Sequence, residues 1–485
     1  MKKYINNIKI AILTISVSLL SSCDKGFEEI NKNPNDPTTV SADLLLPHGI
    51  RSTVNIYWGG GDVYTLGQDV GSGFSQQIAR IQYTDIDQYN IQTNVIDDAW
   101  RDLYIEGQAD YQRVIALGKT ANNENYQAIG LIMRSWSFSI LTDTYGDIPY
   151  KDAIQGTEGK LLTKYDSQKD VYVGLIADLK TASDLINTKA VNATADVLFA
   201  GNMSRWKKFA NSLSLKLLTK MLGKTDTGID VKAEIERILK DPVKYPVFTS
   251  YDDSAVMTFL TDAPNNNPIN QNRKSRDDFR ISTSLLSRLQ ATGDGRLPIY
   301  VLKPEAGGDY KGVPNGLDVT EANALGLSKT SKIGTFFVQP TSPAVIMSYA
   351  ELLFLKAEAA YKGVTLAGDA AKLYDDAVKA SFAQYKLTPS ADFLKAITYK
   401  TGTEGFKQIM EQKWIALFGQ GIESWTEVRR TGYPVLTVPK INFNDNVIPT
   451  RLPYPSSEEN LNGTNMTAAL KGAKNDKKMK MWWMM

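Results

Sequence analysis

The side chains that most often carry catalysis or bind metals are scarce in this sequence. His48 is the only histidine and Cys23 the only cysteine among 485 residues. A zinc site needs several His or Cys ligands, and a Ser–His or Cys–His mechanism would have a single candidate base. The composition therefore excludes multi-histidine zinc sites, internal disulfides and cysteine-ligated iron–sulfur clusters. Enzymes that use carboxylates, lysine or tyrosine remain possible.

The remaining candidates for acid–base chemistry have structural alternatives. His48 lies in a segment with helical spacing, and no second ligand or nucleophile is implied nearby, so it is predicted to be a surface residue. Glu351 and Glu358 lie within an otherwise apolar helical segment and could serve as catalytic acids. Capping, or pairing with Arg429 or Arg430, is the favoured interpretation.

Metal and nucleotide sites are not indicated. Asp252-Asp253 and Asp277-Asp278 could bind calcium through oxygen, but neither has the spaced acids and glycine of an EF-hand loop. We expect both pairs in solvated turns. The sequence has no G-x-x-x-x-G-K-[ST] phosphate loop and no G-x-S-x-G nucleophile elbow. Because 55 Lys and Arg balance 53 Asp and Glu, no basic field indicates nucleic acid. We predict no cofactor, no metal and no nucleic-acid partner.

Cys23 ends an N-terminal segment that is typical of secretion. A positively charged start is followed by eleven uncharged residues, 10–20, which are too few to span a bilayer but fit a secretory h-region. The next residues, LSSC, resemble the lipobox of bacterial lipoproteins, in which the cysteine is acylated after cleavage. We expect a signal peptide over 1–22, lipid attachment at Cys23 and a polar tether over 23–40. An ordinary signal peptide with a chance cysteine is the alternative.

Helical periodicity dominates the rest of the chain. Apolar residues recur at spacings of three and four in segments at 42–54, 99–115, 123–141, 169–186, 204–222, 346–361, 369–385 and 406–418. Asp369 can cap the helix that it begins, and Gly146 can end the helix before it with a positive φ. Aromatic and aliphatic side chains on these stripes are predicted to form the core: Trp100, Trp136, Trp206, Phe209, Leu213, Leu217 and Trp414.

The helix pair over 346–385 has the form of a tetratricopeptide unit, although no strict 34-residue repeat is present. Stretches rich in Gly, Pro and Asn, long enough to be functional or disordered, lie at 261–275, 303–335 and 432–465. We therefore predict a mostly α protein with tetratricopeptide-like helix pairs, long loop-rich insertions and few short strands. Its single body is expected over 41–485, with an N-terminal helical part at about 41–230, a loop-rich middle at about 231–340 and a C-terminal helix-pair part at about 341–485.

Six blocks occur in a distinctive order along the chain. They read LTDTYGDIPY at 141–150, WKKFANSLSL at 206–215, FRISTSLLSRLQATGDGRLPIY at 279–300, MSYAELLFLKAEAA at 347–360, GIESWTEVRRTGYP at 421–434 and RLPYP at 451–455. In this order, and with the lipobox, they resemble the SusD/RagB family of nutrient-binding outer-membrane lipoproteins of Bacteroidetes, in its SusD-like branch. The basic end, KKMKMWWMM, departs from that pattern.

The resemblance implies a function as well as a fold. Such a protein is held in the outer membrane by its lipid anchor and is exposed at the cell surface. It lies on a SusC/RagA-like TonB-dependent transporter, to which it passes an oligosaccharide or, in some members, a peptide. It is not catalytic and needs no cofactor.

Aromatic rings on loops, away from the helical stripes, are candidates for stacking against sugars. Trp58 lies beside a triple glycine, Tyr83 and Tyr89 lie in the polar stretch 81–94, and Tyr310 lies in a glycine-rich loop. We expect at least one of these rings in a ligand groove, while for each ring the alternative is that it pins its loop to the body.

Two other functions remain open from the sequence. A secreted helical glycoside hydrolase would use two carboxylates, and acidic residues are plentiful. A structural scaffold built from helix pairs would bind no small molecule.

Overall fold

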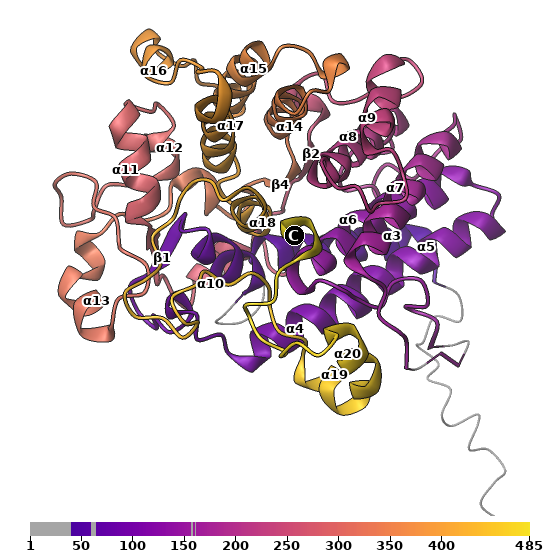
Figure 1. The fold of residues 1–485 in the computed structure, drawn as a ribbon, viewed down its shortest axis with the longest axis horizontal. Helices are drawn as coiled ribbons and strands as arrows, with labels where there is room; N and C mark the ends of the chain where they lie inside the picture. The colour runs from indigo at the N-terminus through magenta and orange to yellow at the C-terminus, as the bar shows by residue number, and fades with distance from the viewer. Residues whose placement is uncertain (1–39, 60–64, 157–158, 161) are drawn as a thin grey trace, which may run out of the picture. The chain divides into compact units, whose positions relative to one another are not determined.

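Helices make up most of the computed structural model, which describes residues 40–485 except 60–64, 157–158 and 161 (Figure 1). Cys23, the signal peptide and nearly all of the tether lie outside the described residues. Ala42–Met485 forms one compact unit. The predicted mostly α fold is confirmed, whereas the predicted domain boundaries remain predictions. Within the described residues, no helix combines the length and apolar character that a membrane crossing requires.

The N-terminal half of the unit is a run of helices that pack against their neighbours in sequence. α5 packs on α6, α6 on α7, α7 on α8 and α8 on α9. The π-helical turns η1 (Leu66–Ser72) and η3 (Leu103–Gln108) also belong to this half. The α-helices are α3 (Ala42–Trp58), α4 (Thr93–Asp102), α5 (Ala109–Thr120), α6 (Glu124–Tyr145), α7 (Gln168–Leu185), α8 (Met203–Met221) and α9 (Val231–Lys240).

The C-terminal half contains the predicted helix pair. α14 packs on α15 and α17, and α17 on α18. The longer helices are α11 (Thr283–Thr292), α14 (Tyr349–Tyr361), α15 (Ala370–Ala383), α17 (Gly402–Ala416) and α18 (Gly421–Thr431). The shorter ones are α10 (Pro268–Arg273), α12 (Leu297–Tyr300), α13 (Val319–Leu325), α16 (Ala391–Ala396), α19 (Ser456–Leu461) and α20 (Gly463–Leu470).

Side-chain caps fix where the helices begin. Ser167 accepts a hydrogen bond from the Asp170 N–H at the start of α7, and Asp369 accepts one from the Lys372 N–H at the start of α15. Each cap satisfies one of the N–H groups that lack a partner within the helix. The predicted cap at Asp369 is confirmed, as is the positive φ of Gly146, which is 91° at the end of α6.

The described strands form two small antiparallel pairs. β1 (Ile78–Arg80) pairs with β3 (Phe279–Ile281), and β2 (Ala255–Met257) pairs with β4 (Ala344–Met347). The prediction of a helix from residue 346 is therefore wrong at its start. Residues 344–347 pair with β2, and Ser348 then caps α14 by accepting the Glu351 N–H.

The core is built from the predicted stripes. All seven stripe residues named above are buried, and Trp206, Phe209, Leu213 and Leu217 are fully enclosed. The basic end also packs into the body. Trp483 is buried, and its indole N–H donates to an oxygen of Asp143 at 3.2 Å.

The three long loops contain short helices and are bound to the body by backbone hydrogen bonds. α10 lies in 261–275, α13 in 303–335 and α19 in 432–465. The Phe443 N–H, for example, donates to the Gln88 carbonyl oxygen at 2.7 Å. These segments are therefore ordered walls on which side chains can be placed.

Candidate functional site

A groove of about 460 Å³ lies where the loops at 303–335 and 432–465 meet helix α11. This volume falls in the range of about 300–1,000 Å³ that is usual for small-ligand sites. Figure 1 shows α11 and α13 at one side of the unit, away from α5 and α7. The groove is lined by Gln76, Ser282, Thr283, Ser284, Ser287, Arg288, Pro314, Asn315, Gly316, Leu317, Glu321, Val435, Thr437, Val438, Pro439 and Lys440.

Helix α11 forms one wall and holds a second wall in place. Ser282 caps this helix by accepting the Ser284 N–H, so the exposed Ser287 lies on the first turns. The guanidinium of Arg288 donates to the hydroxyl of Ser284 at 2.9 Å and to the carbonyl oxygen of Val435 at 2.9 Å. Arg288 therefore ties residues 435–440 to α11.

Residues 314–317 form the third wall. The Asn315 side-chain amide donates to the Ile78 carbonyl oxygen at 2.8 Å, and its oxygen accepts the Ser282 hydroxyl at 2.7 Å. Gly316 has a φ of +73°, and a Cβ at this position would lie 2.4 Å from the Cβ of Pro439. Only glycine fits this close approach, so the third wall rests directly on the second.

The groove has both apolar and polar lining residues, and most of the polar ones are uncharged. Hydroxyl and amide groups come from α11, from Asn315 and from Thr437, whose carbonyl oxygen accepts the Gln76 side-chain amide at 2.6 Å. The charged lining residues are Arg288, Glu321 and Lys440. This arrangement suits a ligand that carries many hydroxyl groups, because it offers both donors and acceptors.

The acidic groups do not form a hydrolytic pair. Glu321 is the one carboxylate among the described lining residues, and it already serves the capping box of α13 with Asp318. Glycoside hydrolysis requires two carboxyl groups on either side of the scissile bond. Among the described lining residues, no second carboxylate lies opposite Glu321.

Two of the four predicted aromatic residues lie at the surface, outside this groove. Tyr83 is 48% exposed, and the guanidinium carbon of Arg276 lies 3.6 Å from its ring centroid. Tyr310 is half-buried, with the Nζ of Lys303 5.6 Å from its ring centroid. Arg276 is itself held by Asp278 at 2.7 Å, so one face of Tyr83 is occupied and its ring orientation is fixed.

The expectation that Trp58 and Tyr89 are exposed loop rings is wrong. Each is 1% exposed. Trp58 belongs to the last turn of α3, and its indole N–H donates to the Val345 carbonyl oxygen at 2.9 Å. Tyr89 packs edge-on against Phe74, with ring centroids 5.1 Å apart. In this conformation neither ring presents a face to a ligand.

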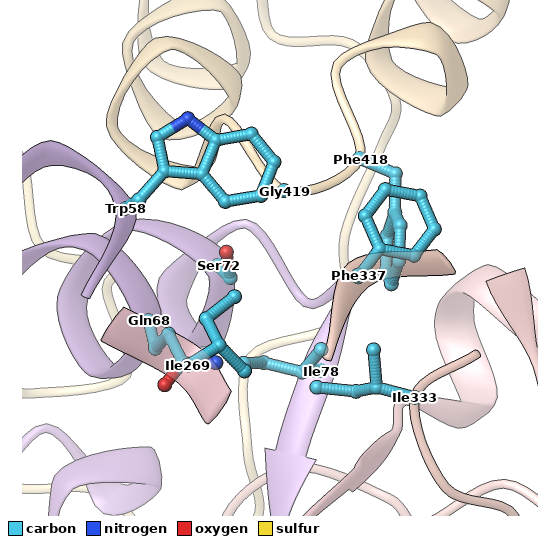
Figure 2. Close-up of a pocket in the computed structure, with 9 residues that line it drawn as sticks. All are labelled: Trp58, Gln68, Ser72, Ile78, Ile269, Ile333, Phe337, Phe418 and Gly419. Atoms are coloured by element: carbon cyan, nitrogen blue, oxygen red, sulfur yellow. The ribbon is translucent and has the colours of Figure 1, made fainter. Parts of the chain in front are cut away.

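Trp58 borders a small internal cavity, shown in Figure 2, with Phe418 on its opposite side. The volume of the cavity is about 10 Å³, which leaves room for one water molecule at most. The cavity is therefore too small for a sugar ring.

A second groove, of about 530 Å³, lies beside α3. Its lining includes His48, which is exposed and paired with Asp110 at 2.6 Å, as expected of a surface residue. Arg51 in the same groove already donates to Asn265 at 2.8 Å. Three of its ten lining residues carry a hydroxyl or amide side chain, against seven of the sixteen that line the groove at α11.

The acidic candidates have structural partners. Glu358 pairs with Arg430 at 2.6 Å, which confirms the predicted pairing, and Glu351 pairs with Lys216 at 2.8 Å. Burial raises the pKa of Glu351, although Lys216 opposes this shift.

The two Asp-Asp pairs are not simple solvated turns. Asp253 and Asp278 are buried, and they pair with Lys208 at 2.8 Å and Arg276 at 2.7 Å. Among the residues that the structure describes, no group of three or more His, Cys, Asp or Glu could hold a metal ion.

Sequence reasoning did not single out the residues of the groove. Gln76, Ser287 and Thr437 are ordinary polar residues far apart in the chain, and the search for aromatic rings passed over them. The available signal was the pair of long loops, which do provide two of the three walls.

Comparison with known proteins assigns this chain to a family. A model of the SusD-like proteins, described as starch-binding and associating with the outer membrane, matches residues 34–455. No curated protein matches the chain. A solved chitin-binding protein is 27% identical, with 91% of this chain and 99% of that chain covered and a TM-score of 0.77.

Two further solved structures share the fold. A chitin-binding SusD homolog from Flavobacterium johnsoniae is 23% identical, with 91% of this chain and 98% of that chain covered and a TM-score of 0.79. A SusD homolog from Bacteroides fragilis is 24% identical, with coverage of 92% and 100% and a TM-score of 0.77. Because the family model covers most of the sequence, and the predicted resemblance is thereby confirmed, this chain belongs to the SusD-like family of outer-membrane-associated nutrient-binding proteins.

Proposed function

We propose that this protein is a cell-surface lipoprotein, anchored through Cys23, that binds an oligosaccharide and delivers it to a SusC/RagA-like TonB-dependent transporter. Family membership supports nutrient binding at the outer membrane. Two structures with the same fold are named as chitin-binding, which makes chito-oligosaccharides the first ligands to test.

The observation that carries the proposal is the groove at α11. It has the volume of a ligand site, and most of its polar lining consists of hydroxyl and amide groups. Two or three sugar residues that each bury apolar area and form hydrogen bonds would give dissociation constants of about millimolar to micromolar.

The lining supports binding without hydrolysis. Glu321 has no second carboxylate opposite it among the described lining residues, so the proposal assigns no catalytic residue. A glycoside hydrolase would instead release shorter sugars from chitohexaose, and a scaffold would not bind it at all.

Tyr83 and Tyr310 are proposed as secondary contacts. The free face of Tyr83, fixed by Arg276, could stack against a sugar that extends beyond the groove. Replacing either ring by alanine should then weaken binding of a long oligosaccharide more than that of a short one.

The experiment is isothermal titration with chitohexaose. Ser287→Trp places a bulky ring in the groove and should weaken binding at least tenfold. Thr181→Trp is the matched control, because Thr181 is also exposed on a helix and bonds the carbonyl oxygen four residues earlier, as Ser287 does. Binding by Ser287→Trp that equals the parent would move the site elsewhere. No binding by the parent would refute chito-oligosaccharides as the ligand, and an oligopeptide that binds in the groove would replace them.

A further inference from the structure

We propose that Asp87, which lies behind the groove, positions the wall formed by Asn315 and Gly316 and makes the affinity for ligand rise with pH. This inference rests on the proposed function, since it concerns the same groove. Asp87 does not line the groove, so it is a positioning residue.

The carboxylate of Asp87 joins three parts of the chain. It lies in the 3-10 turn η2 (Ile86–Gln88) and is 3% exposed. One oxygen accepts a hydrogen bond from the backbone N–H of Arg80, in β1, at 2.8 Å. The same oxygen accepts one from the side-chain amide of Asn315 at 3.4 Å. The backbone N–H of Gly316 also acts to lower the pKa of Asp87.

Asn315 and Gly316 transmit this contact to the ligand site. Both line the groove. Asn315 also bonds the Ile78 carbonyl oxygen and the hydroxyl of Ser282, which caps α11. A change at Asp87 therefore reaches two walls of the groove through one amide side chain.

The charged and titratable groups around Asp87 come from several elements. Asp69 of η1 pairs with the Arg80 guanidinium at 2.5 Å, and Asp278, which precedes β3, lies 3.6 Å from it. Tyr89 follows η2, and its pKa is raised by burial and by the charge of Asp87. Arg80 therefore faces three carboxylates at once.

This environment brings the titration of Asp87 into the physiological range. Burial, with a further contribution from the charge of Asp69, raises the pKa of Asp87 to about 7, although Arg80 and the backbone N–H groups oppose the shift. Above that pH the carboxylate accepts its N–H donors without competition. Below it, a carboxyl proton occupies one acceptor position, so the bond from Asn315 and the attraction of the Gly316 N–H weaken.

Stability and affinity should then move in opposite directions. Because the folded pKa lies above the ordinary value of about 3.9, the contribution of Asp87 to folding is fullest below that value and is lost as pH rises through about 7. The ordered wall, in contrast, requires the ionised form. A merely structural role for Asp87 would not give a rising affinity.

The test measures chitohexaose affinity at pH 5.5 and pH 8.5. The parent is expected to bind about tenfold more tightly at pH 8.5, whereas Asp87→Asn should bind weakly at both values. Asp85→Asn is the matched control, because Asp85 lies two residues away and is exposed; it should behave as the parent. Asn315→Ala removes the amide link and should also flatten the profile. A parent whose affinity is equal at both pH values would overturn the proposal.

A second measurement needs no ligand. Hydrogen–deuterium exchange at pH 8 should be faster in peptides covering 313–318 in Asp87→Asn than in the parent or Asp85→Asn. Equal exchange in all three proteins would overturn the positioning role, even if chitohexaose binds. Faster exchange without any binding by the parent would instead support the positioning role and refute the proposed ligand.

Discussion

Trp58 lies in the last turn of α3, and its indole N–H donates to the Val345 carbonyl oxygen at 2.9 Å. Trp58→Phe keeps an aromatic ring but leaves this buried carbonyl without its partner, so we expect a loss of about 1–3 kcal/mol in the free energy of unfolding. Urea denaturation measures this loss. Trp482→Phe is the control, because Trp482 is only half-buried. A Trp58→Phe protein as stable as the parent would show that the contact contributes nothing.

The burial of Trp58 could have been predicted, whereas that of Tyr89 could not. Leu46, Ile50 and Val54 recur every four residues, and Trp58 is the next member of this stripe. The triple glycine suggested that the helix ended earlier. Tyr89 lies in a turn and has a φ of +63°. A residue in such a turn belongs to no periodic apolar pattern, so the sequence does not indicate whether its ring is buried.

Helices α6, α8, α14, α17 and α18 are joined by buried ion pairs. Lys216 bonds Glu351 and Glu423, both at 2.8 Å, and Arg430 bonds Glu358 at 2.6 Å and Glu427 at 2.7 Å. Since positive and negative groups alternate, each charge has a partner in an interior where a lone charge would be costly. We infer that these pairs specify how the helices are arranged more than they add stability.

Arg430→Met should unfold far more easily, because it leaves Glu358 and Glu427 buried without their main partner. We expect a cost of about 3–5 kcal/mol near neutral pH, measured by urea denaturation. Arg101→Met is the control, since Arg101 forms exposed pairs on α4 that contribute about 0–1 kcal/mol.

The pH dependence of stability gives an independent check on Arg430. Burial alone would raise the pKa of Glu358 and of Glu427, but the charge of Arg430 lowers both pKa values below the ordinary one. Stability from these carboxylates is therefore present above their ordinary pKa of about 4.3 and is lost as pH falls through the lowered values. The parent should lose stability steeply below pH 4, and Arg430→Met less steeply. Parallel pH profiles for the two proteins would contradict this account of the ion pairs.

Among the elements, the long helices were predictable, because apolar residues spaced by three and four form their buried faces. The strand β4 was not, because Ala344–Met347 is as apolar as the helix that follows, and only its pairing with β2 distinguishes it. The ion pairs could be anticipated only in part. Arg430 was one of two arginines predicted as partners of Glu351 and Glu358, and it pairs with Glu358. Glu351 instead meets Lys216 through tertiary packing.

At the scale of the whole molecule, the proposed anchor has a direct test. Cys23→Ala should abolish labelling by an alkyne fatty acid and release the protein from the membrane fraction of cells that process lipoproteins. Two or three acyl chains anchor firmly because each buried CH₂ contributes about 0.8 kcal/mol, and without them no such anchor remains. Ser21→Ala, which keeps a small residue before the cysteine, should remain labelled. Labelling that persists in Cys23→Ala would place the lipid elsewhere.

The groove itself is a property of the assembled unit. Its walls come from positions near 76, 283, 315 and 437, which are brought together by the packing of the segment after η1, of α11 and of two loops. Periodicity predicts helices and their buried faces, but it does not say which loops will meet. Family resemblance supplied the expectation of a ligand, and the packing of these segments forms the groove that we propose for it.

The most direct test of the account is a crystal structure of the protein with chitohexaose bound at saturating concentration. We expect sugar rings in the groove between α11, residues 314–317 and residues 435–440, with Ser287 or Thr437 within hydrogen-bond distance of a hydroxyl or acetamido group. Intact oligosaccharide bound at another surface, with the groove free of sugar, would contradict it.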